Sequence, residues 1–377
     1  MQRRVPPARA DHPPSSPRPP ARSHRVSAAQ RRVCALAAVL AVLGTACREP
    51  PREPQPAQLA APWQERTKSH VHYADRSAPL APGAKHVIWF GHSLLVTDPG
   101  WPAPDDPALD LPALVADLHD AALRSGRTQT PKGRSITFAE GPYGFAYWLD
   151  GQGRARNKLL ALADVPWTHV VGVDLIHLLG EGRFAWPNLY EWAGMLSDSE
   201  SSVRTRTRDV YRFIGLAHET TPSATWVNYV APALANNPGT QPAIDARFAC
   251  IRESARALGR PVIDAPVGAA FRTAEQRAAA RGITGLTLQH DDFLHLRPHG
   301  ALLAAQVLFA TIYDVDPRGL PVPERYRGKL APTAEQEQTV TAFLSEVASD
   351  TWKGTRARCD DAARVSEDAE AAAWLGR

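Results

Sequence analysis

A serine stands directly after an apolar run in the first third of the chain. Residues 86–90 (HVIWF) are typical of a buried strand, and Gly91, His92 and Ser93 follow as a tight turn. In an open α/β sheet, ligands bind outside the carboxyl ends of the strands, which is where this hydroxyl is expected. A serine hydroxyl is a weak nucleophile at neutral pH, so Ser93 needs a base beside it to do chemistry.

The best candidate for that base lies in a block of histidines and acids near residue 290. Asp292 and His295 are three residues apart, on a loop that leads into a helix whose first turn holds Pro298. A carboxylate at this spacing can fold back onto one imidazole nitrogen, which fixes the tautomer and leaves the other nitrogen free to take a proton. Asp291 is the alternative orienting acid, and it could equally serve to solvate the loop.

Strands alternate with helices along the middle of the chain, which predicts a mostly parallel sheet with helices on both faces. The expected strands are residues 86–90, 135–139, 167–174, 224–230 and 261–267, and the expected helices are residues 111–125, 202–219, 244–258, 273–281 and 298–313, with a broken helix up to 163. The loop after the last strand can lie beside the loop after the first if the strand order places those two strands close together. Residues 318–377, with a helix near 333–349, are interpreted as a C-terminal appendage on a domain at 84–317.

The basic character of the chain comes from its N-terminus. The formal net charge is +4, but residues 1–47 hold eight arginines and one acid, so the remainder has a net charge near −3. The charge therefore gives no support for nucleic-acid binding. Residues 33–43 form an apolar run that is short for a membrane span, and Arg31 and Arg32 precede it. This pattern is typical of a signal peptide, and translation is expected to start downstream, near Val26.

The end of that segment, Leu43-Gly44-Thr45-Ala46-Cys47, resembles the processing site of bacterial lipoproteins, in which the cysteine becomes the acylated N-terminus. We therefore expect an exported protein held to the membrane through lipid on Cys47, followed by a tether at 48–83. Secretion after Ala46 and an uncleaved anchor are the alternatives. Cys250 and Cys359 remain, and an exported compartment permits a disulfide between them, although two separate buried thiols fit equally well. No cysteine or histidine spacing indicates a metal, and no cofactor is expected.

Two motifs carry a resemblance to a known family. Gly91-His92-Ser93-Leu94 after an apolar strand is similar to the first block of the SGNH, or GDSL-like, hydrolases, with His92 where that block usually has Asp or Asn. Asp292-Phe293-Leu294-His295 before an apolar helix looks like their last block. The two blocks frame residues 85–317. The resemblance implies a flavodoxin-like three-layer α/β/α sandwich and ester hydrolysis through an acyl-serine, with Ser93 as nucleophile, His295 as general base and then acid, and Asp292 orienting His295.

The resemblance also implies an oxyanion hole built from the Ser93 amide, a glycine after the second strand and an asparagine after the third. Gly144 stands at the glycine position, with Gly141 as the alternative. The third position departs from the family, because Asp174 follows the third strand and an acid there opposes an oxyanion unless it is protonated or turned away. Losing one such donor typically costs about 10²–10³ in rate. Asp174 is better interpreted as a structural strand-end acid, and His177 could donate in place of the asparagine.

Two functions remain after these observations. The first is an exported esterase or deacetylase that acts on a small-molecule or carbohydrate ester. Aromatic residues in or near the loops suit sugar stacking, although they also make ordinary cores; these are Trp101, Tyr143, Tyr147, Trp148, Phe184, Trp186, Tyr190 and Trp192. The second is a surface lipoprotein that kept the fold as a binding scaffold and lost turnover, which the missing asparagine and His92 favour. His92 itself is expected to pack or face substrate rather than act as the base.

Overall fold

The structure is a computed structural model that describes the chain in segments. These are residues 80–97, 109–139, 145–149, 153–174, 200–235, 238–291, 294–354, 356–359, 371 and 373–375. All of them belong to one structural unit, Pro54–Arg377. The expected signal peptide at 1–47 and most of the expected tether at 48–83 lie outside the described residues, so both stay predictions.

A parallel sheet forms the middle of this unit. Its strands are β1 (Val87–Gly91), β2 (Ser135–Ala139), β3 (His169–Gly172), β4 (Thr225–Tyr229) and β5 (Val262–Ala265). They lie in the order β2-β1-β3-β4-β5, and each neighbouring pair is parallel. This is the flavodoxin-like strand order, so the predicted fold class is confirmed.

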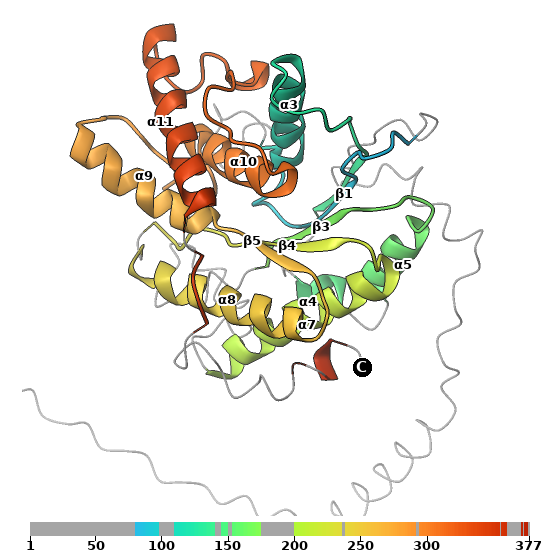
Figure 1. The fold of residues 1–377 in the computed structure, drawn as a ribbon. Helices are drawn as coiled ribbons and strands as arrows, with labels where there is room; N and C mark the ends of the chain where they lie inside the picture. Colours follow the sequence, from blue (N-terminus) through green and yellow to red (C-terminus); the bar gives the residue numbers. More distant parts are fainter. Residues whose placement is uncertain are drawn as a thin grey trace, which may run out of the picture. The chain divides into compact units, whose positions relative to one another are not determined.

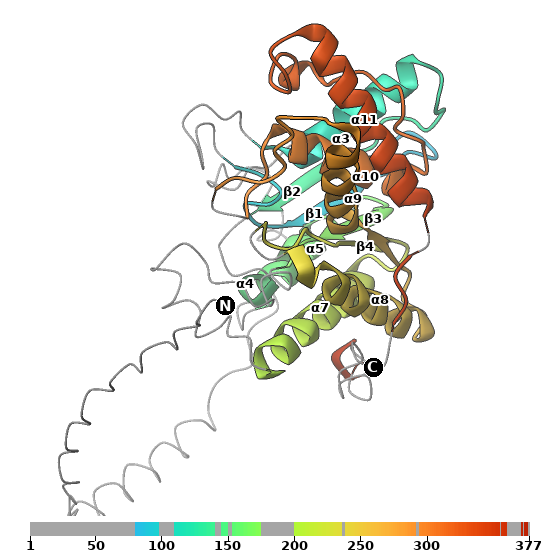
Figure 2. The same ribbon diagram turned by 90° about the vertical axis from the view of Figure 1, so that its left-hand side faces the viewer.

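Helices cover both faces of the sheet, which gives three layers (Figures 1 and 2). One face carries α3 (Leu111–Arg124), α9 (Val267–Arg281), α10 (Pro298–Tyr313) and α11 (Ala334–Lys353). The other face carries α4 (Phe145–Trp148), α5 (Arg154–Ala161), α7 (Glu200–Thr220) and α8 (Gln241–Ala257). Two short 3-10 helices, η4 (Pro238–Thr240) and η5 (Glu324–Tyr326), lie in connections.

The alternation of side chains along β1 shows why its sequence is apolar throughout. Val87 and Trp89 pack into the core under α3 and α10, whereas Ile88 and Phe90 pack into the core over α7. A strand that is covered on both faces has no polar side, so it lacks the alternation of a half-buried strand. Each large apolar side chain buried in this way stabilises the fold by about 1.5–3 kcal/mol.

The helix expected at 298–313 forms with those bounds as α10. Pro298 occupies its first turn, where a missing N–H costs nothing, and its residues are buried on almost every side. α3 begins as expected after Asp110, whose carboxylate accepts a hydrogen bond from the Ala113 amide at 3.0 Å.

The expected start of the helix at 273 is wrong, because α9 begins at Val267, directly after β5. No side chain caps its first turn, which removed the usual sequence signal of a helix start. The Gly268 amide donates instead to the Val230 carbonyl at 2.9 Å. Gly268 also lies against the Gln241 side chain, where any Cβ would be 2.1 Å from Nε2. This glycine therefore belongs to a tight helix–loop contact rather than to a loop.

The chain after α11 runs past β5 towards α8 (Figure 1). Cys359 of this segment forms a disulfide with Cys250 of α8, which answers a question that the sequence left open. Arg252, two residues further along α8, pairs with Asp264 of β5 and donates to the Ala357 carbonyl at 2.8 Å. Burial raises the pKa of the Asp264 carboxyl, and the Arg252 guanidinium opposes that rise. The C-terminal segment is thus tied to α8 by the disulfide and by the hydrogen bond from Arg252 to Ala357.

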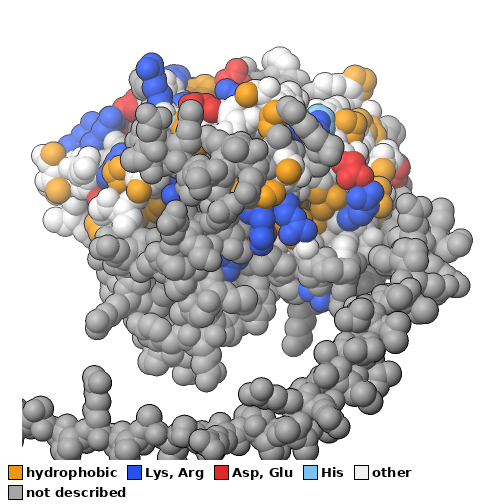
Figure 3. Space-filling view, turned by 90° about the horizontal axis from the view of Figure 1, so that it is seen from below, with side chains coloured by type: hydrophobic (Ala, Val, Ile, Leu, Met, Phe, Trp, Pro, Cys, Tyr) orange, Lys and Arg blue, Asp and Glu red, His pale blue; other side chains and the backbone are white. Residues whose placement is uncertain are grey.

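Surface arginines on the same layer are paired with acids. Arg156 of α5 contacts Glu219 of α7 at 2.7 Å, and both side chains are about half exposed. Figure 3 views the molecule from below and shows Lys and Arg side chains grouped near the middle of the described surface. Exposed pairs of this kind contribute little to stability.

In the described part of the chain, no helix is both long enough and apolar enough to cross a bilayer.

Candidate active site

Ser93 lies just past the carboxyl end of β1, in a turn closed by a hydrogen bond from the Leu95 amide to the His92 carbonyl at 2.8 Å. Gly91 ends the strand at a crowded point, since a Cβ there would be 2.3 Å from Val173 Cγ1. The strand order reverses at β1, because β2 lies on one side and β3 on the other. Ser93 is therefore at the topological switch point, which is the usual ligand position in such sheets.

The hydroxyl of Ser93 contacts the imidazole predicted to be its base. Ser93 Oγ and His295 Nε2 are 2.8 Å apart, although 202 residues separate them in the sequence. His295 is only 3% exposed, whereas Ser93 is partly exposed. With the ring proton on Nδ1, Nε2 accepts the hydroxyl hydrogen bond and is placed to take that proton.

The backbone of the same turn offers a donor. Within the described residues, no acceptor receives the amide N–H of Ser93, whereas the next two amides, of Leu94 and Leu95, point to His92. A backbone N–H beside a nucleophile, with no partner in the protein, is the kind of group that stabilises an oxyanion. The geometry of Ser93 is thus compatible with both expected roles of this residue.

His295 reaches Ser93 on a short antiparallel hairpin, residues 288–297. Gln289 and Leu296 form its bridge, the His290 amide donates to the His295 carbonyl at 2.8 Å, and the Arg297 amide donates to the Leu288 carbonyl at 3.0 Å. Sequence reasoning noted the histidines of this stretch but not the hairpin. The described part of this hairpin extends to Asp291 in one strand and begins again at Leu294 in the other.

The base of this hairpin is fastened to the start of α10. A Cβ on Gly300 would be 2.0 Å from the Leu288 carbonyl oxygen, so only glycine permits this approach. His299 Nδ1 lies 3.2 Å from the Thr287 carbonyl oxygen, and Nε2 lies 2.7 Å from the Leu330 carbonyl oxygen. Sequence reasoning assigned no role to either residue. The Pro-His-Gly run at the helix start was the available signal.

The route by which the two motifs meet differs from the one expected. Strands β1 and β5 are not close, because β3 and β4 lie between them. α10 instead packs against α3, the helix that follows the Ser93 loop, and brings the hairpin at its own N-terminus towards Ser93. Helix packing over the sheet therefore unites the motifs, rather than proximity of the first and last strands.

Of the two acids before His295, the structure describes only Asp291. The Asp291 side chain is 100% exposed, and its carboxylate accepts from Arg297 at 3.2 Å. Asp291 therefore solvates the loop and does not orient His295 in this structure. Asp292 lies outside the described residues, as do Gly141, Gly144, His177 and Cys47, so their expected roles stay predictions.

The acid at the third oxyanion position has a structural partner. Asp174 is 2% exposed, and its Oδ2 accepts a hydrogen bond from the Phe145 amide at 2.7 Å. Phe145 is the first residue of α4 and directly follows Gly144 in the sequence. The carboxylate thus holds the start of this helix, which favours the structural interpretation of Asp174 over a catalytic one.

Two further residues are placed by their burial. His92 is buried, and its Nδ1 lies 3.5 Å from the Leu94 amide nitrogen, so it supports the turn that carries Ser93. Trp148 was expected near the rim of the site, but it is fully buried and packs edge-on against Phe90. Of the two interpretations offered for the aromatic residues, sugar stacking and ordinary core, the core interpretation holds for Trp148. Among the described residues, no group of three or more His, Cys, Asp or Glu side chains is arranged to hold a metal ion.

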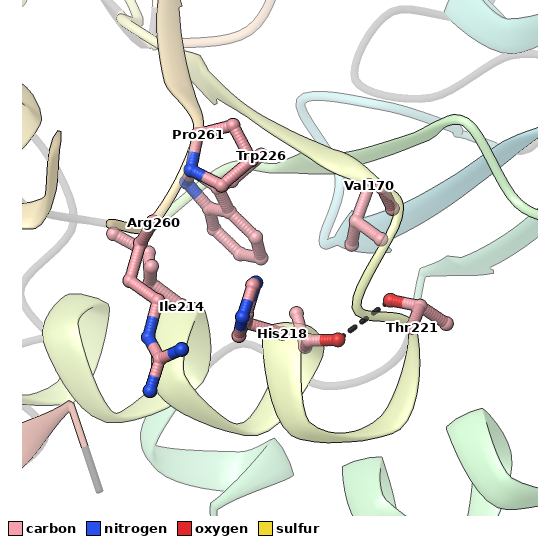
Figure 4. A pocket seen from close by; sticks show the side chains of 9 residues that line it. Val170, Ile214, His218, Thr221, Trp226, Arg260 and Pro261 are labelled. Atoms are coloured by element: carbon pink, nitrogen blue, oxygen red, sulfur yellow. Dashed lines mark hydrogen bonds between the residues drawn. The ribbon is translucent and has the colours of Figure 1, made fainter. Parts of the chain in front are cut away.

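A small hollow lies at the other edge of the sheet, where β4 and β5 begin (Figure 4). Val170, Trp226 and Pro261 line it, with His218 of α7 beside them. Burial, with a smaller effect from Arg260, lowers the pKa of His218. Because Ser93 follows the carboxyl end of β1, this hollow belongs to the edge opposite the candidate site.

No family model and no curated protein matches this chain. Two solved structures have a similar backbone. One is a DUF4886 family protein from Bacteroides uniformis ATCC 8492, with 13% identity over 72% of this chain and 98% of that one, at a TM-score of 0.42. The other bears the name putative GDSL-like lipase, from Parabacteroides merdae ATCC 43184, with 14% identity over 63% of this chain and 99% of that one, at a TM-score of 0.38. Neither likeness says what this chain acts on.

Proposed function

We propose that this chain is a serine hydrolase that cleaves an ester through an acyl-serine intermediate. The hydrogen bond between Ser93 Oγ and His295 Nε2, 2.8 Å long and at the carboxyl edge of the sheet, is the observation that carries the proposal. A nucleophile within hydrogen-bond reach of a base is the signature of covalent catalysis by a serine. The Ser93 amide, for which the described part of the chain offers no acceptor, adds a donor where negative charge would develop.

In the proposed reaction, His295 Nε2 takes the proton of Ser93 as Oγ attacks the ester carbonyl carbon. The carbonyl oxygen becomes an oxyanion, which accepts hydrogen bonds from the Ser93 amide and from the amide at Gly144. His295 then gives the proton to the departing alkoxide, which leaves the acyl group on Ser93. Water then gives a proton to His295 as it attacks the acyl carbon, and His295 returns that proton to Ser93 Oγ as the bond between Oγ and the acyl carbon breaks, which releases the acid. Asp292 is the residue proposed to hold His295 in the required tautomer.

The proposed substrate is a small-molecule or carbohydrate ester, with an acetyl or other acyl group. We also propose that the protein is exported and held to the membrane through lipid on Cys47, with secretion as the alternative. The Cys250–Cys359 disulfide supports a location outside the reducing cytosol, since structural disulfides persist in oxidising compartments. Neither a nucleic acid nor a cofactor is part of this proposal.

The test is turnover of a short-chain nitrophenyl ester by the purified protein, together with labelling by a fluorophosphonate probe. We expect Ser93→Ala to abolish both while the protein stays folded. Ser223→Ala is the matched control, because Ser223 is exposed in the turn before β4, at the opposite edge of the sheet. An unmutated protein that neither turns over ester nor reacts with the probe would favour the alternative of a binding scaffold. Asp174 favours this alternative, because it stands where an asparagine donor was expected and it holds the start of α4 instead.

A further inference from the structure

We propose that Gln289 is a positioning residue for His295, acting through the backbone of Ala233. This inference rests on the proposed hydrolase function. Gln289 lies in the first strand of the hairpin, and His295 lies in the second. The Gln289 Nε2 donates to the Ala233 carbonyl at 3.2 Å. Ala233 lies in the loop that follows β4, so this bond ties the His295 hairpin to the carboxyl edge of the sheet.

The two faces of the hairpin carry different side chains. His290 and His295 lie opposite each other across the strands, so their side chains share one face. Gln289 and Leu296 alternate with them and face the other way. Leu296 is buried in the core beneath α10. The Gln289 amide therefore holds the hairpin from behind, on the face away from the imidazole that contacts Ser93.

Ala233 is itself held from its other side. Its amide N–H donates to Gln241 Oε1 at 2.6 Å, and Gln241 is a buried residue at the start of α8. Gln241 Nε2 donates in turn to Asp245 at 2.8 Å. The backbone N–H and C=O of Ala233 thus both form hydrogen bonds with glutamine side chains. We call Gln241, Ala233 and Gln289 the glutamine clamp.

The clamp lies beside side chains of α9. Gln289, Ala233 and Gln241 surround a small, partly open hollow, together with Phe271 and Arg272 of α9. A two-stranded hairpin has little stability of its own. The Gln289 bond is thus one of the contacts that fix the hairpin, and its loss should allow His295 to move relative to Ser93.

The first test is Gln289→Leu, which keeps most of the side-chain volume and removes the hydrogen bond. We expect kcat for a nitrophenyl ester to fall about 10- to 100-fold while KM changes less than about twofold, since a misplaced catalytic group weakens the chemical step. Labelling of Ser93 by the fluorophosphonate probe should slow in parallel. Gln276→Leu is the control, because Gln276 is an exposed glutamine on α9.

A second variant gives a readout that a merely structural residue would not move. Glu at position 289 donates to the Ala233 carbonyl only while it is protonated, and its ionised form repels that oxygen. The ratio of Gln289→Glu activity to wild-type activity should therefore rise as the pH falls from 8 to 5. The ratio cancels the titration of His295, which both proteins share. This variant also decides the matter if Gln289→Leu fails to fold.

The outcomes separate this inference from the proposed function. A wild-type protein that neither turns over ester nor binds the probe overturns both. If the wild type is active, a folded Gln289→Leu protein with wild-type kcat overturns the positioning role alone. A Gln289→Glu to wild-type ratio that does not change with pH has the same consequence. A fall in kcat with the expected pH-dependent recovery establishes the glutamine clamp.

Discussion

The buried carboxylate of Asp174 accepts a hydrogen bond of 2.7 Å from the backbone amide of Phe145. This bond joins the end of β3 to the first residue of α4, the helix that follows Gly144 in the sequence. A residue that departs from the SGNH pattern thus has a task in the fold. The hydrogen bond from Phe145 requires an acceptor oxygen at position 174 but does not require a negative charge there.

Asp174→Asn should therefore be tolerated, because an amide oxygen can still accept from Phe145. We expect a free energy of unfolding near that of the wild type and, under the proposed hydrolase function, ester turnover that is equal or higher. Asp174→Ala leaves the Phe145 amide buried without an acceptor and should cost about 1–3 kcal/mol. Urea unfolding followed by circular dichroism measures the two changes. Equal stability of the Ala and Asn variants would contradict the structural role.

Ser93 and His295 should behave as one unit in kinetics. Replacing either by alanine removes the proton-transfer pair, so each single variant should lose about 10³-fold or more in kcat. The double variant should lose no more than the worse single variant, because the second substitution removes a group that has already lost its partner. Steady-state rates of all four proteins measure this. Multiplicative losses in the double variant would show that the two residues act independently.

His169, the first residue of β3, predicts a loss of stability in acid. Burial, with a smaller effect from Lys85, lowers the pKa of His169 to about 4. Since the unfolded chain has the ordinary histidine pKa near 6.5, it binds more protons than the folded protein between about pH 6.5 and pH 4. The neutral imidazole therefore contributes stability that is fully present above pH 6.5 and declines as the pH falls through this window.

Urea unfolding at pH 7.0, 5.5 and 4.5 measures that decline, which is expected to reach a few kcal/mol at most, at about 1.4 kcal/mol per pKa unit. His169→Gln should flatten the pH dependence, even if it lowers stability at pH 7. His119 and His86 shift in the same direction by burial, so some slope remains in the variant. A wild-type and a variant curve with the same slope would contradict the assignment to His169.

The Cys250–Cys359 disulfide should contribute substantially to stability, because it closes a loop with a sequence separation of 109 residues. Removing a bridge of this length typically costs about 2–5 kcal/mol. Cys250→Ser with Cys359→Ser should lower the free energy of unfolding by that amount, and dithiothreitol should destabilise the wild type but not the double variant. Reduction should also expose residues 354–359 to protease earlier than the rest of the domain. Unchanged stability after reduction would contradict this contribution and would leave the hydrogen bond from Arg252 to Ala357 as the contact that holds the segment.

The sequence alone determined most of the secondary structure, because the signals for it are local. Apolar runs such as 86–90 predicted strands, Asp110 predicted the start of α3, and Pro298 followed by apolar residues predicted α10 with its observed bounds. α9 was placed six residues too late, because its first turn follows β5 directly and its glycine is explained only by contact with Gln241. A contact between distant residues leaves no trace in local periodicity.

The choice of Ser93 and His295 also came from the sequence, since residue type and spacing limit what chemistry a side chain can do. Their 2.8 Å contact was decided by the tertiary structure. It depends on α10 packing against α3 and on a hairpin fastened through Gly300, His299 and Gln289. The disulfide and the burial of Trp148 were decided in the same way. Each is a meeting of groups far apart in the chain, which only the packing of helices on the sheet brings together.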